Sequence, residues 1–282
     1  MDAKDFKLGY GTYGVPELTP AEALPRIADI GYEGVEICVG ERYPTTPHKL
    51  NDDDRKQLRD LIGELGFELT GLMMVTNPIE ADHDKHDEAK DYLRDCAQLA
   101  TDLAPDNPPC LITTIGGNVE HWEEKKEWIG ERIAEWGDIC KSTGTRLAVE
   151  AHFGSILNTP EKTVWLLERI NEPHVGTNFD FSHFEGIGCD LEETVAALAP
   201  FTIHTHVKDV RPENGGVRYL LPGEGTTDYV QYYKAMARAG AFGFITLEIT
   251  AMIFNVEGYD PWYSAEYSFN SLNVALEQAR PF

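Results

Sequence analysis

Residues 146–183 read RLAVEAHFGSILNTPEKTVWLLERINEPHVGTNFDFSH, and this stretch decides the fold class. It begins with a short apolar run over residues 146–152 and ends with another over residues 175–181, both of strand length. Between them, residues 159–170 have the apolar spacing of an amphipathic helix that is opened by Thr159 and Pro160. Both strands are continuous apolar runs, which is typical of parallel sheets covered on both faces. The stretch therefore predicts a strand, a crossover helix and a second, parallel strand.

The same alternation runs along the whole chain. Expected strands cover residues 7–13, 34–39, 68–74, 110–115, 146–152, 175–181, 202–207 and 244–249. Expected helices cover residues 19–30, 51–65, 86–103, 123–142, 159–170, 190–198, 227–239 and 263–278. Eight such units predict an α/β protein with a closed (β/α)8 TIM barrel, in which residues 1–282 form a single domain. An open doubly wound sheet is the alternative, but Gly9, Gly11 and Gly14 lie inside the first strand rather than in a strand-to-helix turn, which argues against a dinucleotide site.

The composition argues against several classes of partner. The 48 acidic and 24 basic residues give a net charge of −24, which repels nucleic acid and anionic lipid. The sequence has no run of about 18 apolar residues, and residues 1–7 lack the apolar segment of a secretory signal. The five cysteines are scattered without a CxxC pair, as expected of reduced thiols. We therefore expect a cytoplasmic protein with no nucleic-acid partner and no membrane partner.

The last four expected strands end in groups that bind cations or transfer protons. Glu150 and His152 lie at the end of the fifth strand, Asp180 at the end of the sixth, His206 in the seventh and Glu248 in the eighth. The active site of such barrels lies at the C-terminal ends of the strands. Three converging carboxylates repel one another, and a divalent cation removes that cost. Oxygen ligands with one imidazole suit Mn²⁺, Mg²⁺ or Co²⁺, with Zn²⁺ as an alternative, so the cluster predicts a metal site.

A set of motifs follows the order of a known family: Val149-Glu150, Asp180-x-x-His183, His206-Val207-Lys208-Asp209, Pro222-Gly223-Glu224-Gly225 and Leu247-Glu248. This pattern resembles the sugar phosphate isomerase/epimerase superfamily of xylose isomerase-like TIM barrels. The resemblance implies one divalent metal, foremost Mn²⁺, with Glu150, Asp180, His206 and Glu248 as its ligands. It implies that Glu150 and Glu248 also form the acid/base pair and that His183 contacts the substrate. The implied activity is isomerisation or epimerisation of a small ketose or related polyol, by proton transfer through an enediolate.

Departures from the family pattern leave alternatives open. The second and fourth expected strands end without histidine, which, together with the negative charge, argues against an endonuclease IV-like nuclease. Ketose 3-epimerases usually carry Asn soon after the glutamate that corresponds to Glu150, whereas this chain has His152. His152 can act as a general acid or base, which favours a lyase or dehydratase of inososes or 3-keto glycosides, C-glycosides included. A non-catalytic sugar-binding barrel is the third alternative, but it has no need of Glu150 and Glu248 together.

The remaining candidates are substrate contacts and partners. Lys208 and Arg211 are expected to bind substrate oxygens, with pairing to Asp209 or Glu224 as the alternative for Lys208. Residues 210–225 are expected to form a long loop near the site. The expected partners are a small sugar or polyol and further copies of the chain, with a different subunit as partner if the enzyme is a lyase.

The sequence also predicts the environments of three further side chains. Tyr10 and Tyr13, at the end of the first expected strand, are expected to stack on the sugar. His86, in an acidic stretch, is expected to be solvated.

Overall fold

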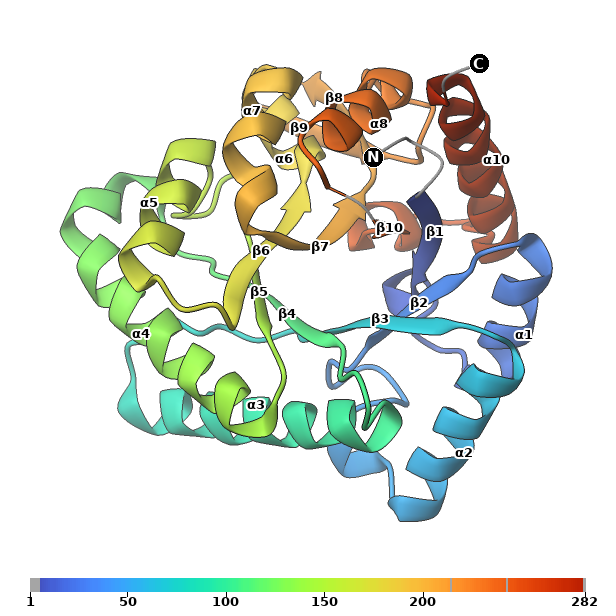
Figure 1. Ribbon diagram of the computed structural model, residues 1–282, viewed down its shortest axis with the longest axis horizontal. Coiled ribbons are helices and arrows are strands. Elements are labelled where there is room, and N and C mark those ends of the chain that lie inside the picture. Colours follow the sequence, from blue (N-terminus) through green and yellow to red (C-terminus); the bar gives the residue numbers. More distant parts are fainter. Residues whose placement is uncertain (1–5, 214, 242, 281–282) are drawn as a thin grey trace.

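The computed structural model describes residues 6–213, 215–241 and 243–280. Within these residues, eight parallel strands close into a barrel in the order β1-β10-β7-β6-β5-β4-β3-β2 (Figure 1). They are β1 Phe6–Gly11, β2 Gly34–Cys38, β3 Glu68–Met73, β4 Cys110–Thr114, β5 Leu147–Glu150, β6 Val175–Asp180, β7 Thr202–Val207 and β10 Gly243–Leu247. The predicted TIM barrel is confirmed, while the outermost residues of the predicted domain, 1–5 and 281–282, lie outside the described residues.

Helices cover the outside of the barrel (Figure 1). They are α1 Pro20–Ile30, α2 Asp52–Glu64, α3 His83–Leu103, α4 Trp122–Thr143, α5 Pro160–Ile170, α7 Leu191–Leu198, α8 Tyr229–Arg238 and α10 Pro261–Ala279. Several begin at a capping side chain: Asp82, Thr159 and Asp190 each accept a backbone N–H from the first turn of the helix that follows. Across the described residues, each helix is too short or too polar to cross a bilayer.

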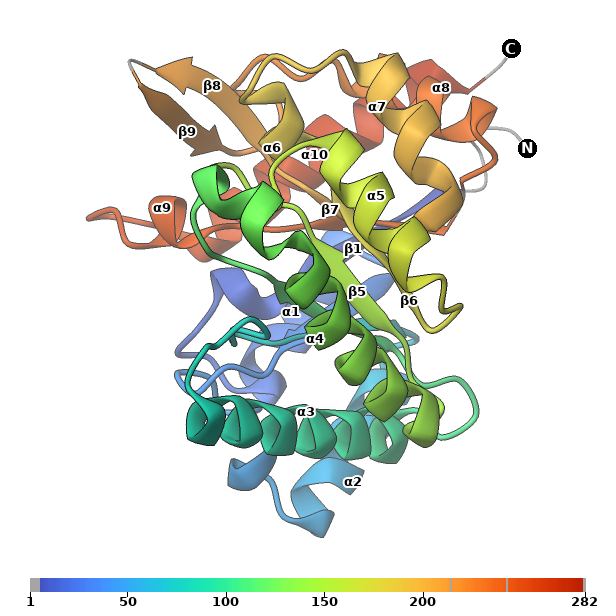
Figure 2. The same ribbon diagram turned by 90° about the vertical axis from the view of Figure 1, so that its left-hand side faces the viewer.

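The stretch expected to be a long loop contains an antiparallel hairpin instead. Strand β8 (Asp209–Glu213) pairs with β9 (Gly216–Leu220), with Asp209 opposite Leu220. The short helices α6 (Phe181–Glu185) and α9 (Ala251–Phe254) also follow barrel strands. Figure 2 shows the hairpin and α9 projecting on the same side of the barrel. The sequence pattern missed the hairpin because its two strands are short and lack a continuous apolar run.

Asp209 holds the loop that follows the hairpin. Its Oδ1 accepts N–H bonds from Val210 (2.9 Å) and Thr227 (3.1 Å), and its Oδ2 accepts one from Gly223 (2.9 Å). Gly225 lies so close that an added Cβ would be 2.2 Å from Asp209 Oδ1, which no side chain can tolerate. The glycines of the Pro-Gly-Glu-Gly motif therefore allow this carboxylate to anchor the loop.

Candidate active site

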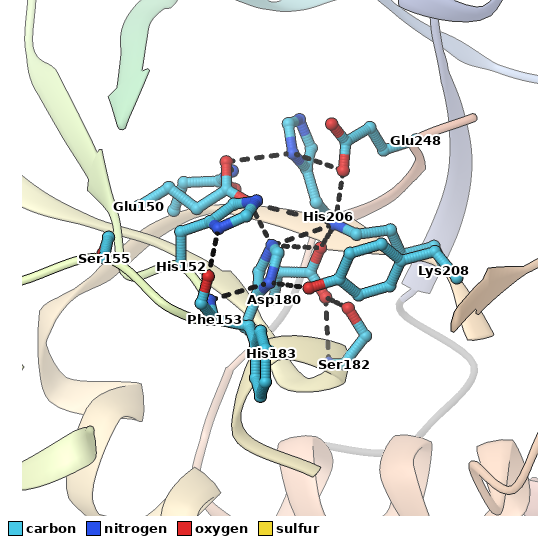
Figure 3. A network of polar contacts seen from close by, with 12 residues as sticks. Glu150, His152, Phe153, Ser155, Asp180, Ser182, His183, His206, Lys208 and Glu248 are labelled. Carbon is cyan, nitrogen blue, oxygen red and sulfur yellow. Dashed lines mark hydrogen bonds and ion pairs between the residues drawn. The ribbon is translucent and has the colours of Figure 1, made fainter. Parts of the chain in front are cut away.

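Four of the predicted residues meet at the C-terminal end of the barrel. Glu150 ends β5, Asp180 ends β6, His206 lies in β7 and Glu248 directly follows β10. The register brings them together, because His206 pairs with Asp180 on one side and with Thr246 on the other. One ligand atom of each of the four lies within 4.8 Å of those of the other three, and the four residues are between 0% and 6% exposed. Figure 3 shows their side chains pointing toward one another.

Lys208 supplies one positive charge to this cluster. Its ammonium contacts the carboxylates of Asp180 and Glu248 and lies 3.9 Å from Oε1 of Glu150. The alternative pairing with Asp209 or Glu224 is not what the structure shows, since Lys208 is only 2% exposed and its ammonium lies within the cluster. Three buried carboxylates thus share one ammonium. The remaining negative charge can be balanced by a divalent cation.

His206 presents a nitrogen suited to binding a metal. Burial raises the pKa of Glu36, but His206 and His204 lower it to about 2, so Glu36 is ionised. His206 Nε2 lies 2.7 Å from Oε2 of Glu36, and because an ionised carboxylate only accepts, Nε2 carries the proton. Its Nδ1 faces Oε2 of Glu150 at 3.4 Å and of Glu248 at 3.8 Å, without a hydrogen-bond partner among the described residues. Burial lowers the pKa of His206, but Glu36 and Glu150 raise it well above 6.5, so the surroundings favour a cation at Nδ1, and a divalent metal ion can take the place of the proton.

The two glutamates of the cluster differ in their affinity for a proton. Burial by itself raises the pKa of Glu150, but His206, His183 and Lys208 outweigh burial and hold this pKa well below 4.5. The pKa of Glu248 is raised, because burial and repulsion from Glu150 exceed the attraction of Lys208. Environments that separate the pKa values of two nearby carboxyl groups are typical of acid/base pairs.

His183 connects Glu150 to Tyr219, a residue of the hairpin. The Phe153 N–H donates to His183 Nδ1 at 3.2 Å, so Nδ1 is an acceptor, and the Tyr219 hydroxyl donates to the same atom at 2.6 Å. Nε2 of the same ring lies 3.1 Å from Oε1 of Glu150 and 3.1 Å from the ammonium of Lys208. Burial and Lys208 lower the pKa of His183 to about 4, in agreement with a neutral ring. His183 is 1% exposed, and its contacts orient Glu150.

His152 keeps a basic nitrogen available. Its Nδ1 lies 2.8 Å from the carbonyl oxygen of Phe153, a contact in which the imidazole must donate. Nε2 is then the unprotonated nitrogen of the neutral ring. The ring packs against that of His183 with their centroids 4.1 Å apart, and His152 is half-buried rather than buried. His152 therefore lies beside the cluster and is still partly accessible to solvent.

Tyr13 lies on an aromatic rim near the cluster. Its ring is 6.0 Å from that of Tyr43 and 5.2 Å from that of Phe254, between centroids. Burial and the charge of Glu248 raise the pKa of Tyr13 to about 12. The structure thus brings Tyr13 within electrostatic reach of Glu248, and its predicted stacking on a sugar stays a prediction.

The predicted surroundings of Tyr10 and His86 need correction, and Arg211, a predicted substrate contact, bonds to a neighbouring loop in the structure. Tyr10 is fully buried and packs edge-to-face on Tyr32, whose hydroxyl bonds to a carbonyl of α10, so Tyr10 belongs to the layer between barrel and helices. Arg211 is exposed and donates to the carbonyl of Glu224 (2.6 Å), so it fastens the hairpin to the next loop. His86 is 1% exposed rather than solvated, because the apolar face of its long helix carries it inward. None of the three joins the cluster.

Sequence reasoning missed Glu36, Asn178 and Tyr219. Glu36 stands in the apolar strand Gly34–Cys38, which is the same signal that identified Glu150. Asn178 pairs in register with Glu150 and donates to its Oε2 at 2.9 Å. Tyr219 had no comparable signal, since its place depends on how the hairpin folds back over the barrel.

Comparisons with known proteins agree with this fold. A family model described as "Xylose isomerase-like TIM barrel" matches residues 24–267. An inosose dehydratase of Clostridium perfringens is 24% identical over 251 residues, which cover 82% of this chain and 82% of the relative. The rhizopine catabolism protein MocC of Rhizobium meliloti is 27% identical over 260 residues, 83% of this chain and 77% of the relative.

Solved structures share the fold. The 3-keto-D-glucoside 4-epimerase of E. coli has a TM-score of 0.76 at 14% identity and covers 95% of this chain and 99% of its own. The IOLI protein, solved with a zinc atom, has a TM-score of 0.77 at 16% identity, with coverage of 97% and 98%. A xylose isomerase-like TIM barrel protein of Mycobacterium smegmatis, solved in complex with magnesium, has a TM-score of 0.72 at 15% identity, with 99% coverage of each chain.

Proposed function

This chain belongs to the xylose isomerase-like TIM barrel family, and we propose that it is a divalent-metal-dependent enzyme that moves a proton next to a carbonyl group of a small sugar or polyol. The leading candidate reaction is the isomerisation or epimerisation of a small ketose. Curated relatives of the chain include inosose dehydratases, and its structural neighbours include a sugar epimerase, which supports a carbohydrate substrate.

One observation carries the proposal: Glu150 and Glu248 approach the same centre from different strands of the barrel. Both carboxylates face His206 Nδ1, at 3.4 Å and 3.8 Å. Ionised Glu150 is suited to take a proton from carbon, and Glu248, which holds a proton more readily, is suited to return one. Groups on two strands can serve two faces of a substrate, which epimerisation requires. A binding module that does no chemistry has no need of this pair.

Glu150, Asp180, His206 and Glu248 would hold the metal. The fit rests on the excess of carboxylates over Lys208 and on the unpartnered Nδ1 of His206. When bound, the metal would polarise a carbonyl and a neighbouring hydroxyl and lower the cost of the enediolate. Three oxygen donors with one imidazole favour Mn²⁺, with Mg²⁺, Co²⁺ and Zn²⁺ as alternatives. Zinc and magnesium are the metals named for the two related structures.

A lyase or dehydratase acting on an inosose or a 3-keto glycoside is the second candidate. His152 favours it, because Nδ1 donates to Phe153 and leaves Nε2 free to take or give a proton beside the cluster. The inosose dehydratases among the relatives support the same candidate. Elimination needs a proton acceptor at carbon and an acid at the leaving group, and His152 with Glu150 could supply these two roles.

The test is a screen in D₂O of the Mn²⁺-loaded protein against ketohexoses, inososes and 3-keto glycosides. Deuterium incorporated at carbon with a new epimer or isomer, and no loss of water or aglycone, identifies the isomerase. An unsaturated or released product that depends on His152, tested as His152→Ala, identifies the lyase. Glu248→Gln should abolish either reaction and weaken metal uptake, while Glu135→Gln, on the outer helix α4, serves as the matched control. Wild-type protein that takes up no metal after Mn²⁺ loading would refute the proposal.

A further inference from the structure

Glu36 lies inside the barrel, below the four proposed ligands. It is 0% exposed and comes from β2, which is separated from β7 by β1 and β10 in the closed barrel. Its Oε2 lies 2.7 Å from Nε2 of His204 and 2.7 Å from Nε2 of His206. Both rings donate to this oxygen, because a carboxylate has no proton to give when ionised. A single buried carboxylate thus holds two histidines of one strand.

The neighbouring strands are shaped to accommodate this carboxylate. Glu36 pairs in register with Gly11 on β1 and with Gly71 on β3. A Cβ at Gly11 would lie 3.1 Å from Glu36 Oε1 and 3.1 Å from a carbonyl oxygen. A Cβ at Gly71 would lie 2.5 Å from Ile112 Cδ1 and 3.3 Å from His204 Cε1. The glycines on both sides leave the space in which Glu36 and His204 meet.

We propose that Glu36 is the positioning residue of the metal site: by accepting the Nε2–H of His206, it fixes the ring so that Nδ1 points at the metal. This inference rests on the proposed function, and it assigns a role to a residue outside the four ligands. A carboxylate behind a metal-binding imidazole selects the tautomer and makes the other nitrogen a better donor. His204 contributes the second hydrogen bond, which keeps the carboxylate of Glu36 in place.

A second metal bound by Glu36, His204 and His206 is the competing explanation, since their ligand atoms also lie within 4.8 Å of one another. Two features favour the positioning role. Both imidazole nitrogens lie at hydrogen-bond distance from the same oxygen, which places protons between them and Glu36. One carboxylate with two imidazoles also lacks the excess of negative charge that distinguishes the cluster above it.

The decisive measurement is the Mn²⁺ affinity of the full chain. It is obtained by titration, with the EPR signal of free Mn²⁺ as the readout. Glu36→Gln should weaken the affinity about 10- to 100-fold, the usual range for the loss of such a partner. Glu135→Gln removes a histidine-bonded carboxylate elsewhere and should leave the affinity unchanged. Equal affinities of wild type and Glu36→Gln would overturn the inference alone, whereas no Mn²⁺ binding by the wild type would refute the proposed function. Two Mn²⁺ ions per wild-type chain, one of them lost in Glu36→Gln, would establish the second metal site instead.

A second measurement uses the wild type and does not need Glu36→Gln to fold. In ¹⁵N-histidine NMR of the Zn²⁺-loaded wild type, His206 should show a proton on Nε2 and a metal-shifted Nδ1. The His204→Asn variant separates the two ring signals without removing a proposed ligand. A His206 ring with its proton on Nδ1, or with Nε2 on the metal, would overturn the role assigned to Glu36.

Discussion

Buried histidines pair with glutamates in two regions of this protein, and the two regions differ in what surrounds the pairs. His206 meets Glu36 inside the barrel, at 2.7 Å, and its Nδ1 faces further carboxylates. His86 meets Glu135 between α3 and α4, at 3.0 Å. Each histidine has a ring nitrogen without a hydrogen-bond partner in the described part of the chain. A buried histidine–glutamate pair is therefore not, by itself, evidence of a functional site.

The difference lies in the balance of charge. Around His86, the Glu135 carboxylate also contacts Lys90 (2.8 Å) and Arg132 (3.5 Å), and it is 40% exposed to solvent. At the end of the barrel, three carboxylates share Lys208 and are closed to solvent. A buried excess of carboxylates suits a metal ion, whereas a balanced and hydrated ion pair is typical of a structural contact.

The largest expected difference between the two regions is in how a substitution changes enzymatic activity. Glu150→Gln should lower kcat/KM about 10²- to 10⁴-fold, the range for the loss of a general base, because the amide cannot take a proton. Glu135→Gln should leave kcat/KM unchanged. Steady-state kinetics on the substrate found in the screen, with circular dichroism to confirm folding, checks both. An active Glu150→Gln would remove the reason for calling the barrel region the catalytic one.

The stabilisation of the protein by a metal should depend on residues of the barrel region and not on those of the outer helices. Mn²⁺ at 100 times its Kd is worth about 2.7 kcal/mol, which corresponds to a rise of about 5–10 °C in Tm for a chain of this size. We expect the full rise in Glu135→Gln and a much smaller one in Asp180→Asn. Calorimetry with Mn²⁺ and then with excess EDTA measures the shift. An undiminished rise in Asp180→Asn would place the metal elsewhere.

The hairpin residue Tyr219 should have an intermediate effect. Tyr219→Phe removes one hydrogen bond to His183, worth about 0.5–1.5 kcal/mol, so kcat should fall about 2- to 10-fold. Mn²⁺ affinity should stay at the wild-type value, because Tyr219 touches none of the four proposed ligands among the bonds described. A loss of metal affinity without a change in kcat would show that the hairpin supports the metal rather than the orientation of Glu150.

The smallest expected effect is the acid sensitivity of the outer pair. Burial raises the pKa of Glu135, but Lys90 and His86 lower it to about 2, from a usual value of 4.5. A lowered carboxyl pKa stabilises the fold above pH 4.5, and this contribution is lost as the pH falls from 4.5 toward 2. Because Glu135 is partly exposed, we expect about 0.5 kcal/mol or less. The urea midpoints of wild type and Glu135→Gln should therefore differ slightly at pH 6 and converge below pH 3, and a gap that widens in acid would contradict this.

Much of the architecture could be predicted because each strand and helix has its own local pattern of apolar residues. The strand over residues 202–207 was expected with its observed bounds, and the end of Pro20–Ile30 was expected at the residue where it occurs. The four residues of the cluster could be named because each is a charged or imidazole group in or directly after an apolar strand. The roles assigned to them as ligands and as acid and base stay proposals.

Other parts could not be predicted because they depend on partners far apart in the sequence. Tyr10 follows the alternation of β1 outward and Tyr13 lies beyond the strand, so two neighbouring tyrosines end in different layers. His86 is buried because of where α3 packs, although its sequence neighbours are charged.

By itself, the sequence determined the order of strands and helices and the carboxylates and imidazoles at the strand ends, because both follow from local periodicity and the cost of burying charge. Only the tertiary structure decided which atoms face one another. Closure of the barrel brings Glu36 of β2 against His204 and His206 of β7, a pairing 168 and 170 residues apart in sequence. Folding of the hairpin brings Tyr219 to His183. These contacts orient the imidazoles of His206 and His183, and no local pattern in the sequence predicts them.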